Sequence, residues 1–392
     1  MAKGFRQMLS ADDRASMAAY EKRGLVVHMT EPVPPFSFIP WAMPFLSQMI
    51  GKAIGLCADT PPDIILGWYF EPYGVAAHLI GRLTGSPVVL QHAGSDLGRL
   101  MNYSDLRALY SHMLSQAACV ITGAKPDVIE RLTEAGADPD RLCRIRGSAL
   151  DPEFNAAEKL DLEPLVEEAE SWFSDYGMPD DVLNTLKEWN RAGLSCGDPA
   201  IGTYGKVAEV KGIYALIDAL DRLAGEGVPV AYHALWSASP KRFAHAFQYL
   251  SAKKALKGRS IILPPLPPWR VPAFTKSCAA VAFLENRFPI AFHGPQIPRE
   301  VLACGRPLIV SGEIYDRQYL RTSWSMASMS CASKTRKIRL CCVRLSEKWF
   351  WIRNCATACR ITAARSCGFS KPACRSGRRS SGFLNGWCKG RR

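Results

Sequence analysis

Two lysines five residues apart flank a turn in the segment YGKVAEVKG, residues 204–212. Lys206 follows Gly205 at the end of an apolar run, and Lys211 precedes Gly212, which opens a helical pattern. Glycine allows the backbone to approach a ligand closely, and the free N–H groups of a helix N-terminus favour an anion. The two ammonium groups could therefore hold a diphosphate, although the same pattern also fits surface lysines beside a turn.

One acid and one histidine stand where loop or strand patterns end. Glu300 lies where a Gly/Pro-rich loop becomes a short helical run. An acid there can stabilise a helix N-terminus by about 0.3–1 kcal/mol, or it can accept two hydrogen bonds from a ribose diol. His92 ends the apolar run PVVLQH before a turn of small residues. It is therefore either a structural histidine or a titratable group that faces a crevice.

Strand and helix patterns alternate in two stretches of the chain. In the first stretch, β-rich runs and helical patterns follow one another at 24–29, 63–69, 73–85, 87–92, 118–123 and 125–136. The alternation resumes at Ala200 and continues to the strand RPLIVS. This order predicts an α/β fold of parallel sheets covered by helices. Ligands of such folds lie in the crevice at the C-terminal ends of the strands.

The segment AGLSCGDP separates the two stretches and reads as a hinge. We expect a first Rossmann-like domain at residues 1–195, in which the acidic helical region 151–195 is an insertion and hinge. A second Rossmann-like domain is expected at residues 196–320, and residues 321–392 form a separate tail.

These segments resemble the group 1, glycogen-synthase-like family of retaining glycosyltransferases. The segment YGKVAEVKGIYALIDAL is similar to the family's diphosphate-binding segment, with Lys206 in place of its Arg and Lys211 matching its Lys. PREVLACGRPLIVSGE looks like the second half of the family's E-x7-E motif, with Glu300 as the second Glu. Residues 61–97 resemble the segment that contains the family's acceptor-side His, which His92 matches.

The resemblance implies a GT-B fold, in which two Rossmann-like domains face each other across a cleft. The C-terminal domain would bind a nucleotide-diphospho-sugar and the N-terminal domain the acceptor. In such an enzyme Lys206 and Lys211 would stabilise the departing diphosphate, and His92 would lie near the transferred sugar.

The other donor-binding residues that the resemblance implies are Gly205, His293, Gly294 and Glu300, with Glu300 holding the ribose. The sugar would be transferred with retention, without a metal or another cofactor, because lysines and helix dipoles replace the metal.

The motif departs from the family at one position. The first Glu of E-x7-E falls on Phe292, and the loop GPQIP follows His293. That first acid ordinarily contacts the donor sugar, so the donor and turnover itself stay open. Glu285 is the nearest acid upstream, and we expect it to lie too far along the chain to be a simple substitute.

Residues 321–392 differ in composition from the rest of the chain. They contain 17 Lys and Arg but a single acid, Glu347, and eight of the 14 cysteines, whereas residues 1–320 contain 32 basic and 35 acidic residues. A zinc module would need paired C-x2-C clusters, which the tail lacks. A basic arm for nucleic acid rarely carries so many cysteines. We favour a disordered or out-of-frame tail, which would leave the C-terminal domain incomplete.

No run of 18 apolar residues occurs, and the N-terminus lacks the apolar core of a signal peptide, so we expect a cytoplasmic protein. The expected partners are a nucleotide-sugar donor and an acceptor that is a glycan, a lipid-linked sugar or a small molecule; nucleic acid is not expected. Three alternatives stay open. The chain could be an impaired remnant that binds a nucleotide diphosphate without turnover, a nucleic-acid binder through its tail, or a sugar-nucleotide epimerase of the same fold.

Overall fold

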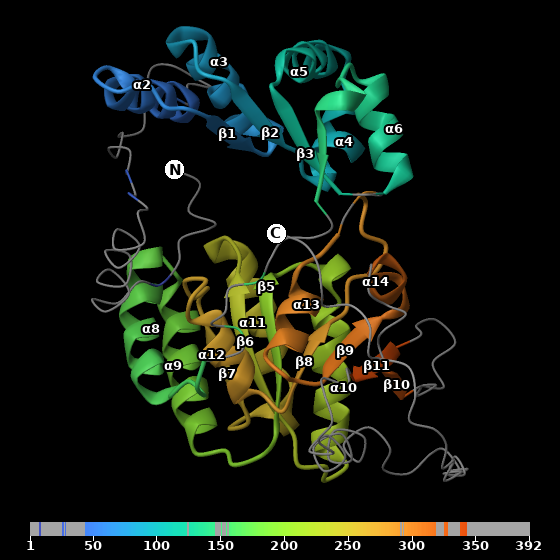
Figure 1. Ribbon diagram of the computed structural model, residues 1–392. Helices are drawn as coiled ribbons and strands as arrows, with labels where there is room; N and C mark the ends of the chain where they lie inside the picture. Colours follow the sequence, from blue (N-terminus) through green and yellow to red (C-terminus); the bar gives the residue numbers. More distant parts are fainter. Residues whose placement is uncertain are drawn as a thin grey trace, which may run out of the picture.

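The chain forms two α/β parts, seen one above the other in the computed structural model (Figure 1). The structure describes residues 44–123, 125–145, 157–290 and 294–318, the single residues 8, 26, 28, 150, 154 and 292, and the backbone of 325–327 and 338–342. Each part contains a parallel sheet covered by helices. The prediction of an α/β fold with two Rossmann-like domains, as in GT-B proteins, is confirmed.

The N-terminal part is a parallel sheet with the strand order β1-β2-β3-β4. Its strands are β1 (Ile65–Trp68), β2 (Val88–Gln91), β3 (Cys119–Thr122) and β4 (Leu142–Arg144). Its helices are α2 (Phe45–Cys57), α3 (Val75–Thr84), α4 (Gly94–Gly98), α5 (Ser104–Gln116) and α6 (Pro126–Glu134). The first three strands lie where the sequence predicted them, and the predicted strand at 24–29 lies largely outside the described residues.

Close packing fixes the first crossover helix against its sheet. A Cβ atom on Gly81 of α3 would lie 2.2 Å from Cγ2 of Val88, so only glycine permits this approach to β2. The helix then ends at Gly85, whose φ of 75° is the left-handed conformation that commonly closes a helix. On the side of α5, Leu90, Tyr110 and Met113 are fully buried and belong to one apolar core.

The C-terminal part is a larger sheet with the order β10-β11-β9-β8-β5-β6-β7. Its parallel strands are β5 (Ala200–Lys206), β6 (Ala231–Ser237), β7 (Ser260–Leu263), β8 (Ala280–Phe283) and β9 (Leu308–Ser311). Its helices are α10 (Ile213–Gly225), α11 (Pro240–Ser251), α12 (Val271–Ser277), α13 (Ile297–Ala303) and α14 (Gly312–Arg317).

The helical region between the two sheets packs differently from the predicted division. Helices α8 (Glu163–Tyr176) and α9 (Asp180–Leu194) lie against the C-terminal sheet beside β7 (Figure 1), and their apolar faces join its core. The side chain of Asn190 donates to the carbonyl of Ile262 and accepts from its N–H, each at 2.8 Å, which satisfies the open edge of β7. The two helices therefore cover the C-terminal sheet, whereas the sequence analysis grouped them with the first domain.

The first residues of the tail add two short strands to the same sheet. β11 (Ile338–Cys342) pairs antiparallel with β9, and β10 (Ser325–Ala327) pairs antiparallel with β11. The remainder of 319–392 lies outside the described residues, so a disordered or out-of-frame tail stays a prediction. No helix in the part of the chain that the structure describes is both long and apolar enough to span a membrane.

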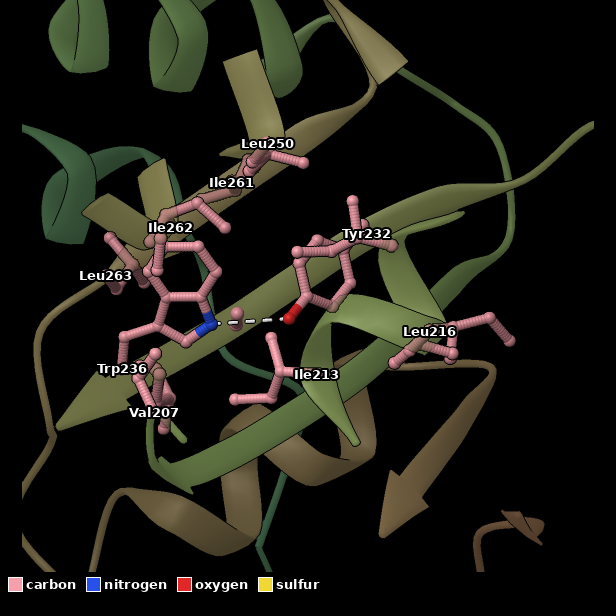
Figure 2. Close-up of a cluster of buried hydrophobic side chains, with 14 of the residues drawn as sticks. Val207, Ile213, Leu216, Tyr232, Trp236, Leu250, Ile261, Ile262 and Leu263 are labelled. Carbon is pink, nitrogen blue, oxygen red and sulfur yellow. Dashed lines mark hydrogen bonds between the residues drawn. The ribbon is translucent and has the colours of Figure 1, made fainter. Parts of the chain in front are cut away.

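A buried aromatic pair on β6 supports the loop that follows β5. Trp236 Nε1 donates to the hydroxyl of Tyr232 at 3.2 Å, as the dashed line in Figure 2 shows, and Thr203 on β5 bonds to the same hydroxyl at 2.9 Å. Val207 and Ile213, labelled in Figure 2, are buried in the same core. They lie on either side of the turn that carries Lys211, so the two ends of this loop are anchored in the core.

A buried histidine on β6 makes stability depend on pH. His233 is 9% exposed, its Nδ1 has no hydrogen-bond partner among the described residues, and burial lowers its pKa to about 4. The unfolded chain, in which a histidine titrates near 6.5, binds more protons than the native state between about pH 6.5 and 4. The free energy of unfolding should therefore fall by up to about 3 kcal/mol as the pH drops through that window.

Urea unfolding at pH 7, 5.5 and 4.5 measures this dependence. His233→Leu should make the curve shallower in that window, while His245→Gln, at an exposed position of α11, should leave it unchanged. An equal acid dependence in wild type and His233→Leu would show that His233 does not cause it.

Candidate functional site

A pocket of about 50 Å³ opens at the C-terminal ends of β5 and β8, the edge of the sheet at which the sequence predicted a ligand. The residues that line it are Thr203, Tyr204, Gly205, Lys206, Lys211, Ile213, Trp236, Ala282, Phe283 and Ile297. Three predicted site residues, Gly205, Lys206 and Lys211, therefore lie together. The apolar floor comes from the core, and the two lysines supply positive charge.

Backbone conformation explains the glycines that flank the two lysines. Gly205 has a φ of 118°, which only glycine adopts readily, and Gly212 has a φ of 72°. Gly212 also lies against the segment after β8, because a Cβ atom there would be 2.5 Å from the carbonyl oxygen of Leu284. Gly212 then caps α10, whose first turn has no side-chain cap. The glycine thus permits close contact between two loops as well as an open helix N-terminus.

Gly212→Ala should destabilise the protein by about 2–4 kcal/mol, because it combines left-handed backbone strain with a backbone clash. Chemical denaturation measures the loss. Gly197→Ala is the matched control, since nothing lies within 4 Å of a Cβ atom at that position, and its effect should stay within about 0.5 kcal/mol. Equal stability of the two variants would contradict the close approach of Leu284 to Gly212.

Lys211 forms an ion pair with Glu285, two residues after β8. The Glu285 side chain is fully buried and that of Lys211 is 18% exposed. The ammonium nitrogen also lies 4.5 Å from the ring centroid of Phe288. Burial, and then the charge of Lys206, lowers the pKa of Lys211 to about 8, whereas the Glu285 carboxylate acts in the opposite direction because it stabilises the charged form. The sequence analysis considered Glu285 only as a substitute for the missing first Glu and did not foresee its pairing with Lys211, which the fold brings about.

The loop after β8 is held by the helix that follows β9. The carboxylate of Glu313 on α14 accepts from the backbone N–H of Arg287 at 2.6 Å and of Phe288 at 3.3 Å. Arg317 pairs with Glu313 at 2.7 Å and donates to the carbonyl of Ile290 at 3.0 Å. These contacts fix the segment that carries Glu285 and Phe288 beside Lys211.

Glu300 lies in the first turn of α13 and contacts the pocket through Tyr204. The Tyr204 hydroxyl donates to Oε2 of Glu300 at 2.8 Å. Burial raises the pKa of Glu300, and burial together with the neighbouring carboxylate raises that of Tyr204. The tyrosine therefore stays a hydrogen-bond donor that orients the carboxylate. The sequence analysis missed this partner, although Tyr204 is the first residue of the segment YGKVAEVKG that contains both lysines.

Phe292 and Gly294, two described residues of the β8–α13 loop, are not part of the pocket lining. Gly294 is exposed, and a Cβ atom there would meet nothing within 4 Å. His293 lies outside the described residues. Phe292, which occupies the position of the family's first Glu, packs against the apolar core of the N-terminal part. Phe292 thus makes an apolar contact with the other part of the chain.

His92 lies directly after β2, in the N-terminal part. Its Nε2 is 2.8 Å from the Thr122 hydroxyl at the end of β3, and its Nδ1 is 3.4 Å from the carbonyl oxygen of Ala93. Burial lowers the pKa of His92, so the imidazole is neutral near pH 7. The two ring nitrogens therefore already have protein partners, and the ring is fixed at the C-terminal edge of its sheet.

Asp96 orders the turn that follows His92, and sequence reasoning missed it. Its carboxylate is 1% exposed, and Oδ2 accepts from the N–H groups of Ala93 at 2.7 Å and Phe70 at 3.1 Å. These bonds join the segments after β1 and β2. The capping pattern in AGSD, where an acid can bond back to the residue three before it, is the signal that could have identified Asp96.

Among the described residues, no group of three or more His, Cys, Asp and Glu side chains could hold a metal ion. Metal independence stays a prediction.

The N-terminal part of the chain is similar in sequence to a known protein family. Residues 23–123 match the family model described as "Glycosyl transferase 4-like", a range that includes the first three strands of the N-terminal sheet. No curated protein matches. The N-terminal part is therefore glycosyltransferase-like in sequence, which agrees with the class of enzyme that the motifs predicted.

Three solved structures to which the chain is similar have the following names and measures of similarity. Anabaena HepE in complex with UDP-glucose is 15% identical, with 76% of this chain and 70% of that chain covered and a TM-score of 0.46. Sucrose-phosphate synthase from Thermosynechococcus elongatus is 14% identical, with coverage of 71% and 64% and a TM-score of 0.44. A putative UDP-N-acetylglucosamine 2-epimerase from Listeria monocytogenes is 16% identical, with coverage of 68% and 61% and a TM-score of 0.43. The chain thus spans about two thirds of the length of these proteins.

Proposed function

We propose that the protein transfers a sugar from a nucleotide-diphospho-sugar to an acceptor, with retention at the sugar and without a metal ion. The observation that carries the proposal is the pocket at the ends of β5 and β8, into which Lys206 and Lys211 project their positive charge beside the N-terminus of α10. A departing diphosphate there would be stabilised by two charge-assisted contacts and by the helix dipole.

Glu300 and His92 complete the proposed site from two sides. Oε2 of Glu300 accepts from Tyr204, and the carboxylate, acceptor-only when ionised, retains capacity for a ribose hydroxyl through its other oxygen. His92, a neutral ring at the edge of the N-terminal sheet, would contact the transferred sugar or the acceptor. The match of residues 23–123 to a glycosyltransferase model supports the role of this half.

Released nucleotide provides the direct test of turnover. The protein is incubated with UDP-glucose, ADP-glucose and GDP-mannose, with and without a panel of glycan acceptors and with EDTA, and free nucleoside diphosphate is measured. We expect acceptor-dependent release from one donor that persists in EDTA, and NMR of the product should show the anomeric configuration of the donor. Release from no donor in any mixture would contradict the proposed transfer.

An impaired protein that binds a nucleoside diphosphate without turnover is the second candidate. The observation that favours it is Phe292, which stands at the position of the family's first Glu and packs on the N-terminal core. In that case nucleoside diphosphates would bind while every donor stayed intact. An epimerase would instead convert its nucleotide sugar without an acceptor, and retention on DNA that disappears without 321–392 would indicate a nucleic-acid binder.

A further inference from the structure

Glu285 is a buried acid that no part of the proposed transfer yet uses. It follows β8, its side chain is fully buried, and its carboxylate pairs with the ammonium of Lys211. Its backbone is fixed as well, because the Ser311 hydroxyl donates to its carbonyl oxygen and the next residue, Asn286, donates to the carbonyl of Val210 at 2.9 Å. The segment after β8 and the lysine turn are therefore joined by backbone and by charge.

A buried lysine needs such a partner to stay charged. The ammonium nitrogen of Lys211 lies 5.8 Å from the ring centroid of Phe283 and 4.5 Å from that of Phe288. Such apolar surroundings favour the neutral amine. Lys206 adds repulsion. A neutral amine would lack the positive charge that the proposed function requires of this residue.

We propose that Glu285 is a positioning residue of the diphosphate site, which keeps Lys211 protonated and directed at the pocket without itself touching the donor. This inference rests on the proposed function. The geometry supports it in two ways: Glu285 is completely buried and is not part of the pocket lining, whereas Lys211 contacts the carboxylate and lines the pocket. The acid therefore acts on a ligand only through the lysine.

Few other charges can take over this role. On the elements around the ammonium, Lys206 of β5 is a like charge, and Glu209 lies on the same turn, η4 (Glu209–Lys211). Tyr204 of β5 donates to Glu300. Glu313 of α14 accepts from the N–H of Arg287 and pairs with Arg317. Glu285 is the acid for which the structure records an ion pair with Lys211.

The first measurement is the affinity of the full chain for UDP between pH 6.5 and 9 by calorimetric titration, with ADP and GDP as further probes. Wild type should lose affinity as the pH rises above about 8, where Lys211 deprotonates. Glu285→Gln keeps the shape of the side chain but removes the charge, so the pKa of Lys211 should fall. At pH 8 this variant should bind UDP about 5- to 20-fold more weakly than wild type, and at pH 6.5 the difference should shrink.

Two further variants separate this role from a structural one. Lys211→Arg/Glu285→Gln carries a guanidinium that stays charged without an acid, so it should regain affinity above pH 8 relative to Glu285→Gln alone. In a Lys211→Met background, Glu285→Gln should have no further effect on UDP binding. Thermal unfolding of each variant checks that it is folded, and the Lys211→Met/Glu285→Gln variant leaves no uncompensated buried charge.

A different pattern of affinities would overturn the inference. If Glu285 only neutralises the site, Glu285→Gln will bind UDP as tightly as wild type or more tightly at every pH while Lys211→Met binds weakly, and the inference is overturned. A failure of the proposed function looks different, because wild type would then bind none of the three nucleotides and the role of Glu285 would fall with it.

Discussion

A Lys206→Met/Lys211→Met variant should bind a nucleoside diphosphate at least about 100-fold more weakly than wild type, because each charge-assisted hydrogen bond contributes about 1.5–3 kcal/mol. Both side chains line the pocket at the ends of β5 and β8. Methionine keeps an unbranched side chain only one atom shorter than that of lysine, so the pocket should largely keep its shape. Calorimetric titration with UDP, ADP and GDP at pH 7 measures the loss.

A cation at the other end of the sheet provides the matched control. Lys257 is exposed and precedes β7, at the edge opposite the pocket. Lys257→Met removes positive charge without touching the site and should change the affinity less than twofold at 0.15 M salt, since a charge so far away is screened. Equal losses in the two proteins would mean that overall charge, and not this pocket, attracts the nucleotide.

Asn190→Ala should lower the free energy of unfolding by about 2–5 kcal/mol. The side chain makes two buried hydrogen bonds of 2.8 Å to the backbone of Ile262 on β7, the last strand of the sheet. Truncation leaves a buried N–H and a buried carbonyl without partners, at about 1–3 kcal/mol for each group. The loss would also loosen α9, which covers that edge. Urea denaturation of the whole chain measures the change.

Thr185→Ala on the same helix is the control for Asn190→Ala. The Thr185 hydroxyl donates to the carbonyl of Asp181 within the helix and is exposed. Its removal should change stability by less than about 0.5 kcal/mol. If Asn190→Ala were as mild, α8 and α9 would not depend on β7 for their position, and their assignment to the C-terminal domain would be contradicted.

The regular elements of the fold were predictable because they depend on local patterns. Apolar runs of strand length, such as PVVLQH and SIILPP, became parallel strands, and helical patterns such as 73–85 became crossovers ending in glycine. The helices α8 and α9 were placed with the wrong domain, because an amphipathic pattern shows which face is buried but not which sheet covers it. The helices cover the C-terminal sheet because Asn190 bonds to the open edge of β7, and these two sites are far apart in sequence.

The candidate site was predictable only in part. The spacing of Lys206 and Lys211 located the pocket, since the end of β5 and the start of α10 are adjacent in sequence. The pairing of Glu285 with Lys211 was not foreseen, because the two residues are far apart in sequence and only the parallel pairing of β5 with β8 brings the two strand ends together. The Tyr204 contact with Glu300 likewise crosses from a strand to a helix 96 residues later. Such contacts follow from strand order, which a single sequence does not specify.

A crystal structure of the protein with UDP tests the central claim most directly. We predict that the diphosphate lies within hydrogen-bond distance of Nζ of Lys206 and Lys211, at the N-terminus of α10, with the ribose beside Glu300. The ion pair of Lys211 with Glu285 should persist in the complex. A diphosphate bound elsewhere, for example on the basic segment after residue 320, or a pocket that stays empty at saturating UDP, would contradict the account.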